Sequence, residues 1–278
     1  MSAPISVLVL TLNEEKNLEA CLQTFTWTDD VIVLDSGSTD RTRQIAEAAG
    51  ARVFTRQFDD WSSHQNWAVR NLPFRNGWVY YTDADERMTP ELQCELTAIA
   101  TAGSTSCVAY RVRFKNMFLG RWIRRASMYP VWVLRFFRPD KVGWERLVNP
   151  VAVVEGTEGK LMGHFEHYSF NNGFNAWFEK HNNYSSGEAR ELLRGLTARI
   201  TWRALFGADA ASRRKALKAV AYRVPFRPFL VLFYLYFVRG GWLEGMAGFR
   251  YCLLRFIYEY MIDMKVLEAR RAGEGMSL

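Results

Sequence analysis

The sequence Val79-Tyr80-Tyr81-Thr82-Asp83-Ala84-Asp85-Glu86-Arg87 changes from mainly apolar to mainly charged at its midpoint. An apolar, β-prone run from Trp78 to Tyr81 stops at Asp83 and Asp85, so both carboxylates follow directly on a predicted strand. Strand ends of this kind are where α/β sheets bind ligands. Two close carboxylates repel unless a cation or an arginine neutralises them, and their oxygens suit Mg²⁺ or Mn²⁺ that also carries substrate phosphates. An ordinary polar turn is the alternative, because D-x-D alone is a weak motif.

Three apolar runs precede this stretch, and each has the pattern of a short strand. Ile5–Leu10 and Val31–Leu34 are continuous and partly β-branched, as in strands buried on both faces of a parallel sheet, and Ala51–Phe54 is a third, shorter run. Helical patterns separate the runs, with short connections. The order β-α-β-α-β predicts a parallel α/β sheet with right-handed crossovers.

The connecting segments carry helix-end signals. Asn13 is a candidate N-cap, with Glu14 and Glu15 expected in the first turn of its helix. Gly50 suits the C-terminal end of a helix over residues 41–49. Residues 61–71 are expected to be a loop that enters a helix. Thr89 followed by Pro90 predicts the start of another helix.

A polar segment, Asp35-Ser36-Gly37-Ser38-Thr39-Asp40, follows the second predicted strand. It leads into a helix N-terminus, so its backbone N–H groups could bind an anion. The segment lacks the G-x-x-x-x-G-K-[ST] pattern, and no G-x-G-x-x-G follows the first strand, so P-loop and dinucleotide-binding folds are disfavoured. Asp35 stands at a strand end where it could accept from a nucleobase N–H group, whereas Asp40 has the position of a helix cap.

Four motifs, taken in order along the chain, resemble those of the family 2 glycosyltransferases of GT-A fold. They are Thr11-x-Asn13-Glu14, then Val33 to Asp40, then Ala68 with Asn71, and then Asp83 to Glu86. The similarity covers about the first hundred residues. The segments VLDSGSTD and DADERMTPEL are most similar to those of the bacterial branch that contains the lipopolysaccharide core β-1,4-glucosyltransferases acting on heptose. Relatives often carry a Lys near Gln65 or Asn66, and this sequence has none there, so that diphosphate contact is left unassigned.

The resemblance implies a Rossmann-like, mixed and mostly parallel sheet flanked by helices, and it assigns roles to side chains. Asp35 would lie near the uracil or ribose. Asp83 and Asp85 would bracket a divalent cation and the donor ribose, with Asp85 the preferred metal ligand. His167 fits the place of a late metal-ligating histidine better than His164, although a lone histidine is more often structural. The nucleotide pocket would be lined by Thr11, Asn13, Glu14, Ser36, Ser38 and Asn71.

The candidate general base lies further along the chain. In similar sequences a hydrophobic-His-Glu element occupies this place, and here Trp144 replaces the His while Glu145 remains. An inverting transfer needs a group that deprotonates the acceptor hydroxyl, and Glu145 is suited to that role. An ion pair between Glu145 and Arg146 or Arg124 is the alternative reading, and Asp140 is the second candidate base.

Two strand patterns, over residues 109–118 and 131–137, flank a basic loop in this acceptor half. The loop, Arg121-Trp122-Ile123-Arg124-Arg125, could bind an anionic acceptor or could simply be solvated.

The C-terminal part of the chain is basic and aromatic. Formal net charge is +7, and basic residues are dense from Arg194 to Arg227. The apolar runs Phe229–Val238 and Trp242–Met264 follow, and neither is long and clean enough to span a bilayer. These features favour amphipathic helices that lie in the interface of an anionic leaflet over helices that pack on the catalytic domain or form a dimer contact. Residues 269–278 are expected to fray.

These patterns predict a GT-A catalytic domain over residues 1–172, with a nucleotide-sugar half to about residue 100 and an acceptor half from 101 to 172. A membrane-associating helical extension would occupy residues 173–278. Four cysteines without C-x-x-C spacing argue against a zinc site or a disulfide framework, and the N-terminus lacks a signal-peptide layout. We expect a peripheral protein at the cytoplasmic face of a bacterial inner membrane, with any homo-oligomer contact through the C-terminal helices and no nucleic-acid module.

The leading functional hypothesis is a metal-dependent, inverting transfer of a hexose, glucose first, from a UDP-sugar to a lipid-linked glycan such as the lipopolysaccharide inner core. Two alternatives stay open. One is transfer to a polyprenyl phosphate, whose phosphate oxygen needs no strong base. The other is a non-catalytic, basic scaffold that binds membrane or nucleic acid through its charge.

Overall fold

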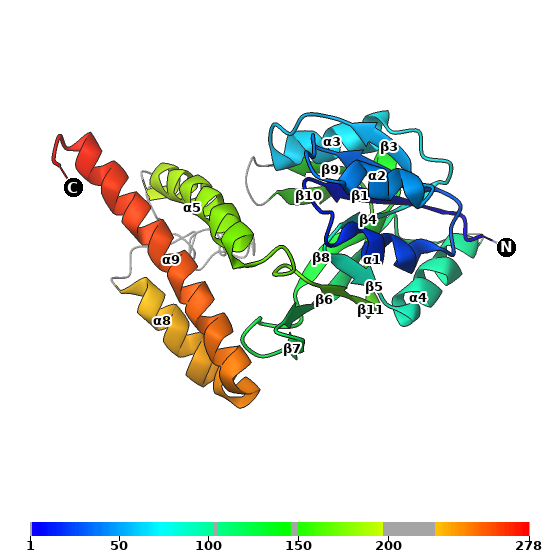
Figure 1. Cartoon of the computed structure of the whole chain (residues 1–278). Helices are drawn as coiled ribbons and strands as arrows, with labels where there is room; N and C mark the ends of the chain where they lie inside the picture. Colours follow the sequence, from blue (N-terminus) through cyan, green and yellow to red (C-terminus); the bar gives the residue numbers. More distant parts are fainter. Residues whose placement is uncertain (1, 103–104, 146–149, 197–225, 278) are drawn as a thin grey trace. The chain divides into compact units, whose positions relative to one another are not determined.

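The computed structural model describes residues 2–102, 105–145, 150–196 and 226–277. The chain forms two compact units (Figure 1). The first, here called the sheet unit, comprises residues 1–124 and 129–173, and the second, the helical unit, comprises residues 125–128 and 174–278. The division after residue 173 lies one residue from the boundary expected from the sequence.

The N-terminal half of the sheet unit is parallel, with the strand order β3-β2-β1-β4. Its strands are β1 (Ile5–Thr11), β2 (Val31–Asp35), β3 (Arg52–Thr55) and β4 (Trp78–Asp83). The connecting helices are α1 (Leu18–Leu22), the 3₁₀ turn η1 (Gln23–Phe25), α2 (Thr42–Ala48) and α3 (Trp61–Asn71). The β-α-β-α-β order predicted from the apolar runs is confirmed.

The second half of the sheet is mixed. Strand β8 (Trp132–Phe137) pairs antiparallel with β4, and the order continues β8-β6-β11-β5, with β7 beside β6. Strands β6 and β11 are parallel to each other, whereas β5 and β11 are antiparallel. The bounds are β5 (Glu86–Met88), α4 (Pro90–Thr101), β6 (Ala109–Phe118), β7 (Arg121–Ile123), η2 (Pro139–Lys141), β9 (Val142–Glu145), β10 (Val151–Val154) and β11 (Glu158–His167). This mixed sheet with flanking helices is the fold class expected of a GT-A protein.

Both faces of the parallel sheet are covered by apolar cores. All seven residues of β1 are buried, and they alternate between two clusters. Ile5, Val7 and Val9 belong to one cluster, and Leu8 and Leu10 belong to the other. A strand buried on both faces needs an unbroken apolar run instead of an alternating one, which is why the sequence of β1 contains no polar side chain except Ser6 before its last residue.

Some local expectations are confirmed and others are wrong. Thr89 caps α4 by accepting a hydrogen bond from the Leu92 N–H, with Pro90 in the first turn. Residues 61–71 form helix α3 throughout, capped by Asp60. The assignment of Asn13 as an N-cap is wrong, because Asn13 has a left-handed backbone (φ 55°) and α1 begins only at Leu18.

The described part of the helical unit consists of helices and tight helical turns. They are α5 (Phe174–Leu196), α8 (Arg227–Phe233), which continues into a π-helical turn η3 (Tyr234–Val238), and α9 (Gly245–Gly273), which is preceded by the 3₁₀ turn η4 (Gly241–Glu244). Both α5 and α8 pack on α9. The C-terminal residues expected to fray remain helical as far as Gly273.

Within the described residues, every helix is too short or too polar to cross a lipid bilayer. Most of the basic stretch between Arg194 and Arg227 lies outside the described residues, as does Arg146.

Candidate functional site

The carboxyl ends of three adjacent parallel strands meet at one edge of the sheet. Thr11 at the end of β1 is in register with Asp35 at the end of β2, and Leu10 is in register with Asp83 at the end of β4. Thr11 and Asp35 are hydrogen-bonded through Oγ1 and Oδ1 at 3.2 Å. The sheet thus gathers three of the side chains that the sequence singled out, as expected for a parallel α/β fold.

The loops after β1 and β2 are fastened to each other by side chains from the sequence motifs. Asn13 donates its backbone N–H to the Ser38 hydroxyl, and its Oδ1 accepts from the Thr39 N–H, both at 2.8 Å. The Glu14 N–H donates to the Thr42 hydroxyl at 2.8 Å. Asn tolerates the left-handed backbone that this geometry requires. Asn13, Glu14 and Ser38 therefore lie together at the carboxyl edge.

Asp35 is fully buried, and its carboxylate is used within the loop that follows it. It accepts hydrogen bonds from the backbone N–H groups of Gly37 and Ser38 at 3.1 and 3.0 Å and from the Thr11 hydroxyl. These bonds fix the shape of the loop. The assignment of Asp35 to the uracil or ribose stays a prediction.

Ser36 leads from this loop to a buried histidine that sequence reasoning did not single out. The Ser36 hydroxyl lies 3.3 Å from Nε2 of His64, and Nδ1 of His64 lies 2.8 Å from Nη1 of Arg56. Burial and the nearby Arg56 charge hold the pKa of His64 below its usual value. A neutral imidazole therefore supports Ser36 at the carboxyl edge.

Asp83 is neutralised by an arginine, one of the two means that the sequence left open. Oδ2 of Asp83 lies 2.7 Å from Nη2 of Arg135 on β8, and Oδ1 accepts from the Tyr81 hydroxyl at 3.2 Å. Arg135 is only 8% exposed, and its guanidinium stacks over the Tyr81 ring. Both oxygens of Asp83 are engaged in these contacts, and its assignment to the cation and the donor ribose stays a prediction.

Glu86 is the second carboxylate on Arg135. It forms an ion pair with Arg135 and accepts from the Thr82 hydroxyl at 2.9 Å. Burial raises the pKa of Glu86 to about 7, although the Arg135 charge opposes the shift. Arg135 is the principal residue that sequence reasoning missed at this edge. The signal was a charged residue inside an otherwise apolar strand, because a buried arginine needs partners.

Asp85 lies beside His167, at the end of β11. Oδ2 of Asp85 is 3.3 Å from Nε2 of His167. The backbone N–H of Tyr168 donates to the Asp85 carbonyl at 2.8 Å, which holds the end of β11 against the turn that carries the two aspartates. On the other side of the ring, Nδ1 of His167 lies 3.1 Å from Oδ1 of Asn116. Asn116 thereby orients the imidazole so that Nε2 faces Asp85.

The Asp85–His167 pair suits a cation that brings most of its own ligands. Among the residues that the structure describes, no group of three or more His, Cys, Asp or Glu side chains could hold a metal ion. Mg²⁺ and similar ions are commonly bound by one or two protein groups, with water and substrate phosphates completing the sphere. The donor set of one carboxylate oxygen and one imidazole nitrogen therefore fits a phosphate-bearing Mn²⁺ or Mg²⁺ better than a closed structural site.

Glu14 ties the segment after β1 to the segment that follows His167. Its carboxylate accepts from Nδ2 of Asn17 at 2.8 Å and from Nδ2 of Asn172 at 3.1 Å. Asn171, beside Asn172, donates to Oδ1 of Asn17 at 2.9 Å. The segment after β11, which follows directly on His167, is thus tied to the segment after β1. Residues 155 positions apart are brought together at one edge, although nothing in their local sequence indicates the contact.

Glu145 is exposed and lies on β9, which pairs antiparallel with β10 in a separate two-stranded ribbon. Its strand is attached to α3 by one side chain, because Asn66 accepts from the Trp144 N–H at 2.9 Å and donates to the Trp144 carbonyl at 2.8 Å. The Trp144 ring meets the Tyr81 ring edge-on at 6.2 Å, and Tyr81 contacts Asp83. The candidate base therefore follows a residue packed against the carboxylate edge. Arg146, the partner of Glu145 in the alternative reading, lies outside the described residues.

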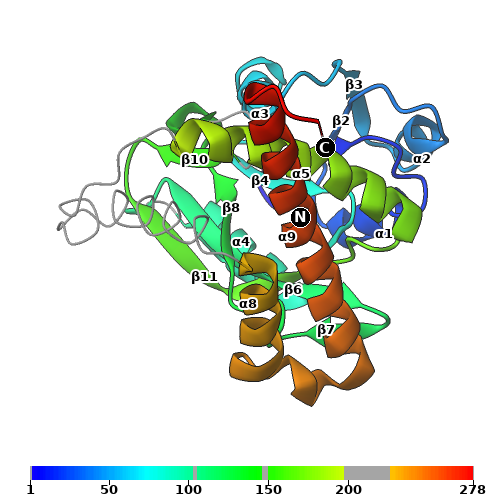
Figure 2. The same ribbon diagram turned by 90° about the vertical axis from the view of Figure 1, so that its left-hand side faces the viewer.

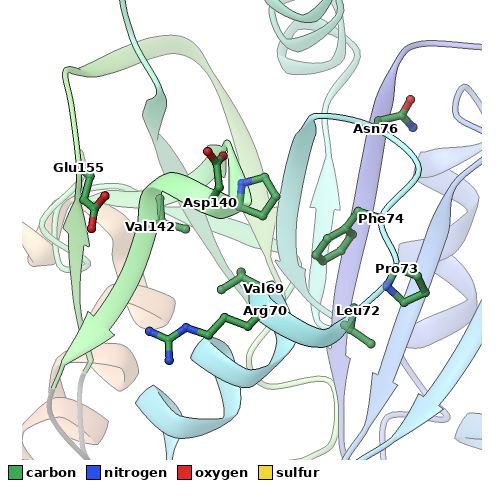
Figure 3. A pocket seen from close by; sticks show the side chains of 10 residues that line it. Val69, Arg70, Leu72, Pro73, Phe74, Asn76, Asp140, Val142 and Glu155 are labelled. Carbon is green, nitrogen blue, oxygen red and sulfur yellow. The ribbon is translucent and has the colours of Figure 1, made fainter.

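Asp140, the second candidate base, lies elsewhere. It lines an open cavity of 550 Å³ together with Arg70, Asn76 and Glu155 (Figure 3). Asn76 precedes β4, whereas Asp83 ends it, and a strand of this length separates its two ends by about 20 Å. The cavity is thus at the opposite edge of the sheet from Asp83, and Asp140 is poorly placed to act there.

Asn71 is the other candidate that the fold does not bring to the carboxyl edge. It ends α3, and its Nδ2 donates to the Trp67 carbonyl at 2.9 Å. Because α3 returns the chain to the start of β4, its last turn lies at the amino end of that strand. The middle of α3 reaches the site instead, since Nε2 of Gln65 donates to the Tyr81 hydroxyl at 3.0 Å.

Comparison with known proteins identifies the family. Residues 6–156 match the sequence profile described as Glycosyl transferase family 2, which is more than half of the chain. This chain belongs to glycosyl transferase family 2. The resemblance inferred from the four motifs is confirmed, and the matched residues include Thr11, Asp35, Asp83, Asp85 and Glu145.

Relatives of this family 2 glycosyltransferase are known among curated proteins. It is 23% identical over 276 residues to the lipopolysaccharide core biosynthesis glycosyltransferase LpsC of Rhizobium meliloti, covering 95% of this chain and 92% of LpsC. It is 29% identical over 202 residues to an uncharacterized glycosyltransferase of Rickettsia typhi, covering 68% of each protein. The match to LpsC extends through the helical unit, so this family 2 enzyme shares its C-terminal extension with a relative.

Solved structures resemble the fold more distantly. Staphylococcus aureus TarS (residues 1–349) aligns with a TM-score of 0.45 and 14% identity over 98% of this chain and 92% of that one. Glucosyl-3-phosphoglycerate synthase of Mycobacterium tuberculosis, in complex with Mn²⁺, UDP and glucosyl-3-phosphoglycerate, aligns with a TM-score of 0.35 and 24% identity, covering 41% of this chain and 44% of that one. Similarities this distant do not bear on the substrate of this glycosyltransferase.

Proposed function

We propose that this glycosyltransferase uses a divalent cation to transfer a hexose, with inversion, from a UDP-sugar to a lipid-linked glycan of the lipopolysaccharide inner-core type. The observation that carries the proposal is the Asp85–His167 pair, at 3.3 Å, on the same sheet edge as the Asn13–Ser38 loops. A carboxylate and an imidazole at this edge can hold a cation beside the phosphates of a nucleotide whose base and ribose lie against the loops.

The site must stabilise the leaving group of the transfer. When the bond between the anomeric carbon and the phosphate oxygen breaks, negative charge develops on the leaving diphosphate, and a cation held by Asp85 and His167 would stabilise that charge. Arg135 lies behind Asp83 and would compensate part of the negative charge of Asp83 and Glu86 next to the bound diphosphate. Asn116 keeps the imidazole pointed at Asp85.

Glu145 is the proposed general base. It would take the proton of the acceptor hydroxyl while that oxygen attacks the anomeric carbon from the face opposite the diphosphate. The products are the glycosylated acceptor, a protonated Glu145 and UDP. The support for this role is the packing of its neighbour Trp144 against Tyr81 and the family position of the acidic residue. An exposed carboxylate on a ribbon beside the sheet is accessible to a large acceptor.

The substrate classes rest on relatives and on motifs. The similarity to LpsC over most of both chains supports an acceptor in lipopolysaccharide core biosynthesis and a place at the cytoplasmic face of the inner membrane. A shorter match, 45% identical over 58 residues, is to glucosyl-3-phosphoglycerate synthase of Mycobacterium tuberculosis, which supports glucose as the first donor sugar to test. UDP as the nucleotide follows from the resemblance of the Thr11 to Glu14 and Asp35 to Asp40 motifs.

The test is calorimetric titration with UDP in the presence of Mn²⁺ or Mg²⁺ and again with EDTA, followed by UDP-glucose against other UDP-sugars. We expect UDP binding that is lost with EDTA and a preference among the sugars. A folded protein that binds UDP equally well with and without a cation contradicts the metal role. A folded protein that binds no UDP contradicts the donor assignment, and turnover on a polyprenyl phosphate but on no sugar hydroxyl contradicts the acceptor.

A further inference from the structure

Helix α8 and the π-helical turn after it expose large apolar side chains. Five large apolar side chains recur along their outer side at short helical intervals, and each is more than half exposed. They are Phe229, Leu230, Phe233, Phe237 and Val238. The inner side of the same helix carries Leu235 and a charged residue, Arg227, both of which are buried. On the surface of a water-soluble domain, the outer side of a helix carries polar residues instead.

The buried charge on α8 is compensated by α9. Arg227 is 8% exposed and forms an ion pair with Glu259 and a second, at 2.8 Å, with Asp263. Arg255 lies 3.3 Å from Glu259 and completes the cluster. Helices α8 and α9 are side by side in both views (Figures 1 and 2). This ion cluster fixes the rotation of α8 about its axis, so the apolar side chains are held outward.

The exposed apolar surface continues beyond the turn. Trp242 and Leu243 in η4 and Met246 at the start of α9 are also more than half exposed. Gly240 has a left-handed backbone (φ 78°), and a side chain at Gly248 would collide with the Gly241 carbonyl. These glycines allow the chain to reverse tightly between the two helices. The eight exposed apolar residues from Phe229 to Met246 named above are here called the apolar stripe.

The positive charge of the protein is concentrated in the same part of the chain. Residues 174–278 contain 17 Lys and Arg against 9 Asp and Glu, whereas residues 1–173 contain 19 against 20. The whole excess of +7 therefore belongs to the C-terminal part. A segment so charged is repelled by a second copy of itself and attracted by an anionic surface.

We propose that the apolar stripe inserts into the interface of an anionic lipid bilayer, with α8 and the start of α9 lying along the membrane surface. Aromatic and aliphatic side chains enter the boundary between headgroups and acyl chains, while Lys and Arg contact anionic headgroups. Contiguous apolar surface of this size marks an interaction site on a soluble protein, and the charge selects anionic lipid over a second copy of the chain. This goes beyond the proposed glycosyl transfer, because it requires neither donor nor acceptor.

The test is co-sedimentation of the full-length protein with vesicles of phosphatidylglycerol and phosphatidylcholine, without donor or acceptor. The variant Phe233→Ser/Phe237→Ser removes two adjacent aromatic rings of the stripe, whose centroids are 5.2 Å apart. The matched control is Met162→Ser/Val153→Ser, which removes two exposed apolar side chains from the sheet unit. We expect the stripe variant to lose at least about tenfold in vesicle partitioning, and the control to bind as the wild type does.

Lipid composition and oligomeric state complete the test. Vesicles of phosphatidylcholine alone, or high salt, should weaken binding of the wild-type protein, because headgroup attraction is screened. Equal partitioning of the wild type and the stripe variant would overturn the proposal. So would a wild-type dimer that the stripe variant converts to a monomer and that does not bind vesicles, because a second copy would then cover the stripe. UDP binding by both variants reports separately on the sheet unit.

Discussion

Each unit of this glycosyltransferase buries an arginine between two carboxylates, and the surroundings of the two arginines are opposite. Arg135 lies between Asp83 and Glu86, next to an edge where polar side chains gather. Arg227 lies between Glu259 and Asp263, beneath an exposed apolar stripe. The same kind of ion pairing lies beside the candidate site in one unit and beneath exposed apolar side chains in the other. A buried ion cluster therefore indicates a function only when the side chains that it holds in place are known.

The largest effect should come from Asp85, the carboxylate that would hold the cation beside the Arg135 cluster. Asp85→Ala should lower the rate of transfer by about a thousandfold or more, because a cation contributes several kcal/mol to the stabilisation of the leaving group. The fold should be unchanged, since the ion pairs of Arg135 are with Asp83 and Glu86. Steady-state kinetics and circular dichroism check this. Substantial activity in a folded Asp85→Ala protein would show that the cation is held elsewhere.

The candidate base should give the next largest effect. Glu145→Gln should retain UDP binding and lose about 10²- to 10⁴-fold in kcat, the range expected for a general base. Pre-steady-state rates and UDP titration separate the two steps. Asp140→Asn is the matched control, because Asp140 lies at the opposite edge of the sheet and should change the rate little. A normal kcat for Glu145→Gln would remove Glu145 from the mechanism.

Substitution of the two arginines compares the clusters directly. Arg135→Met leaves Asp83 and the buried Glu86 without their ion-pair partner and should destabilise the sheet unit by about 3–5 kcal/mol. Arg227→Met should cost less, about 1.5–3 kcal/mol, because Arg255 remains on Glu259 and the Asp263 side chain is 37% exposed. Chemical denaturation measures both.

The activities of the same two variants sharpen the comparison. Arg135→Met should also weaken metal-dependent UDP binding, whereas Arg227→Met should leave that binding intact and reduce vesicle partitioning. Loss of UDP binding in a folded Arg227→Met protein would mean that the two clusters do not serve separate purposes.

The smallest effect concerns pH and belongs to the helical unit alone. His181 on α5 stacks on Trp177 and meets Tyr258 of α9. Burial, with Lys180 and Arg255 nearby, lowers the pKa of His181 from 6.5 to about 4. Below pH 6.5 the imidazole binds a proton more readily in the unfolded chain than in the folded one. The contribution of His181 to the free energy of unfolding is therefore fully present above pH 6.5 and is lost as the pH falls towards 4.

Helical circular dichroism during urea unfolding checks the pH effect. The midpoint should fall between neutral and acidic pH, and His181→Gln should make that fall shallower. An identical pH dependence in the wild type and in His181→Gln would exclude the histidine as its source. The carboxylate edge of the sheet unit is unaffected by this substitution, so UDP binding at neutral pH serves as the control.

The sequence predicted the fold best for strands that are buried on both faces, because such strands are unbroken apolar runs. Ile5–Leu10 and Val31–Leu34 predicted β1 and β2 because such runs have few other stable arrangements. The resemblance implied Asp85 as a metal ligand and His167 as a candidate second ligand, and the structure brings their side chains to 3.3 Å. The backbone of Asn13 was not predicted, because its left-handed conformation depends on hydrogen bonds to Ser38 and Thr39 from a distant loop.

Arg135 and the apolar stripe escaped prediction for a related reason. The partners of Arg135 are more than forty residues away in the chain, so local patterns identify a buried charge without naming what neutralises it. The apolar run Phe229–Val238 was recognised, but a run that is apolar on all sides does not say which side faces outward. That choice follows from the ion pairs of Arg227 with α9, which only the packed helices reveal.

Asn66 acts in this protein as a stand-in for a neighbouring strand. Its amide makes both of the backbone hydrogen bonds that a sheet partner would offer to Trp144, and apolar packing between α3 and the β9–β10 ribbon adds to this link. Changes along the ribbon leave the ladder of the main sheet untouched. A substitution on the ribbon therefore need not alter the strand pairing of the sheet that carries Thr11, Asp35 and Asp83.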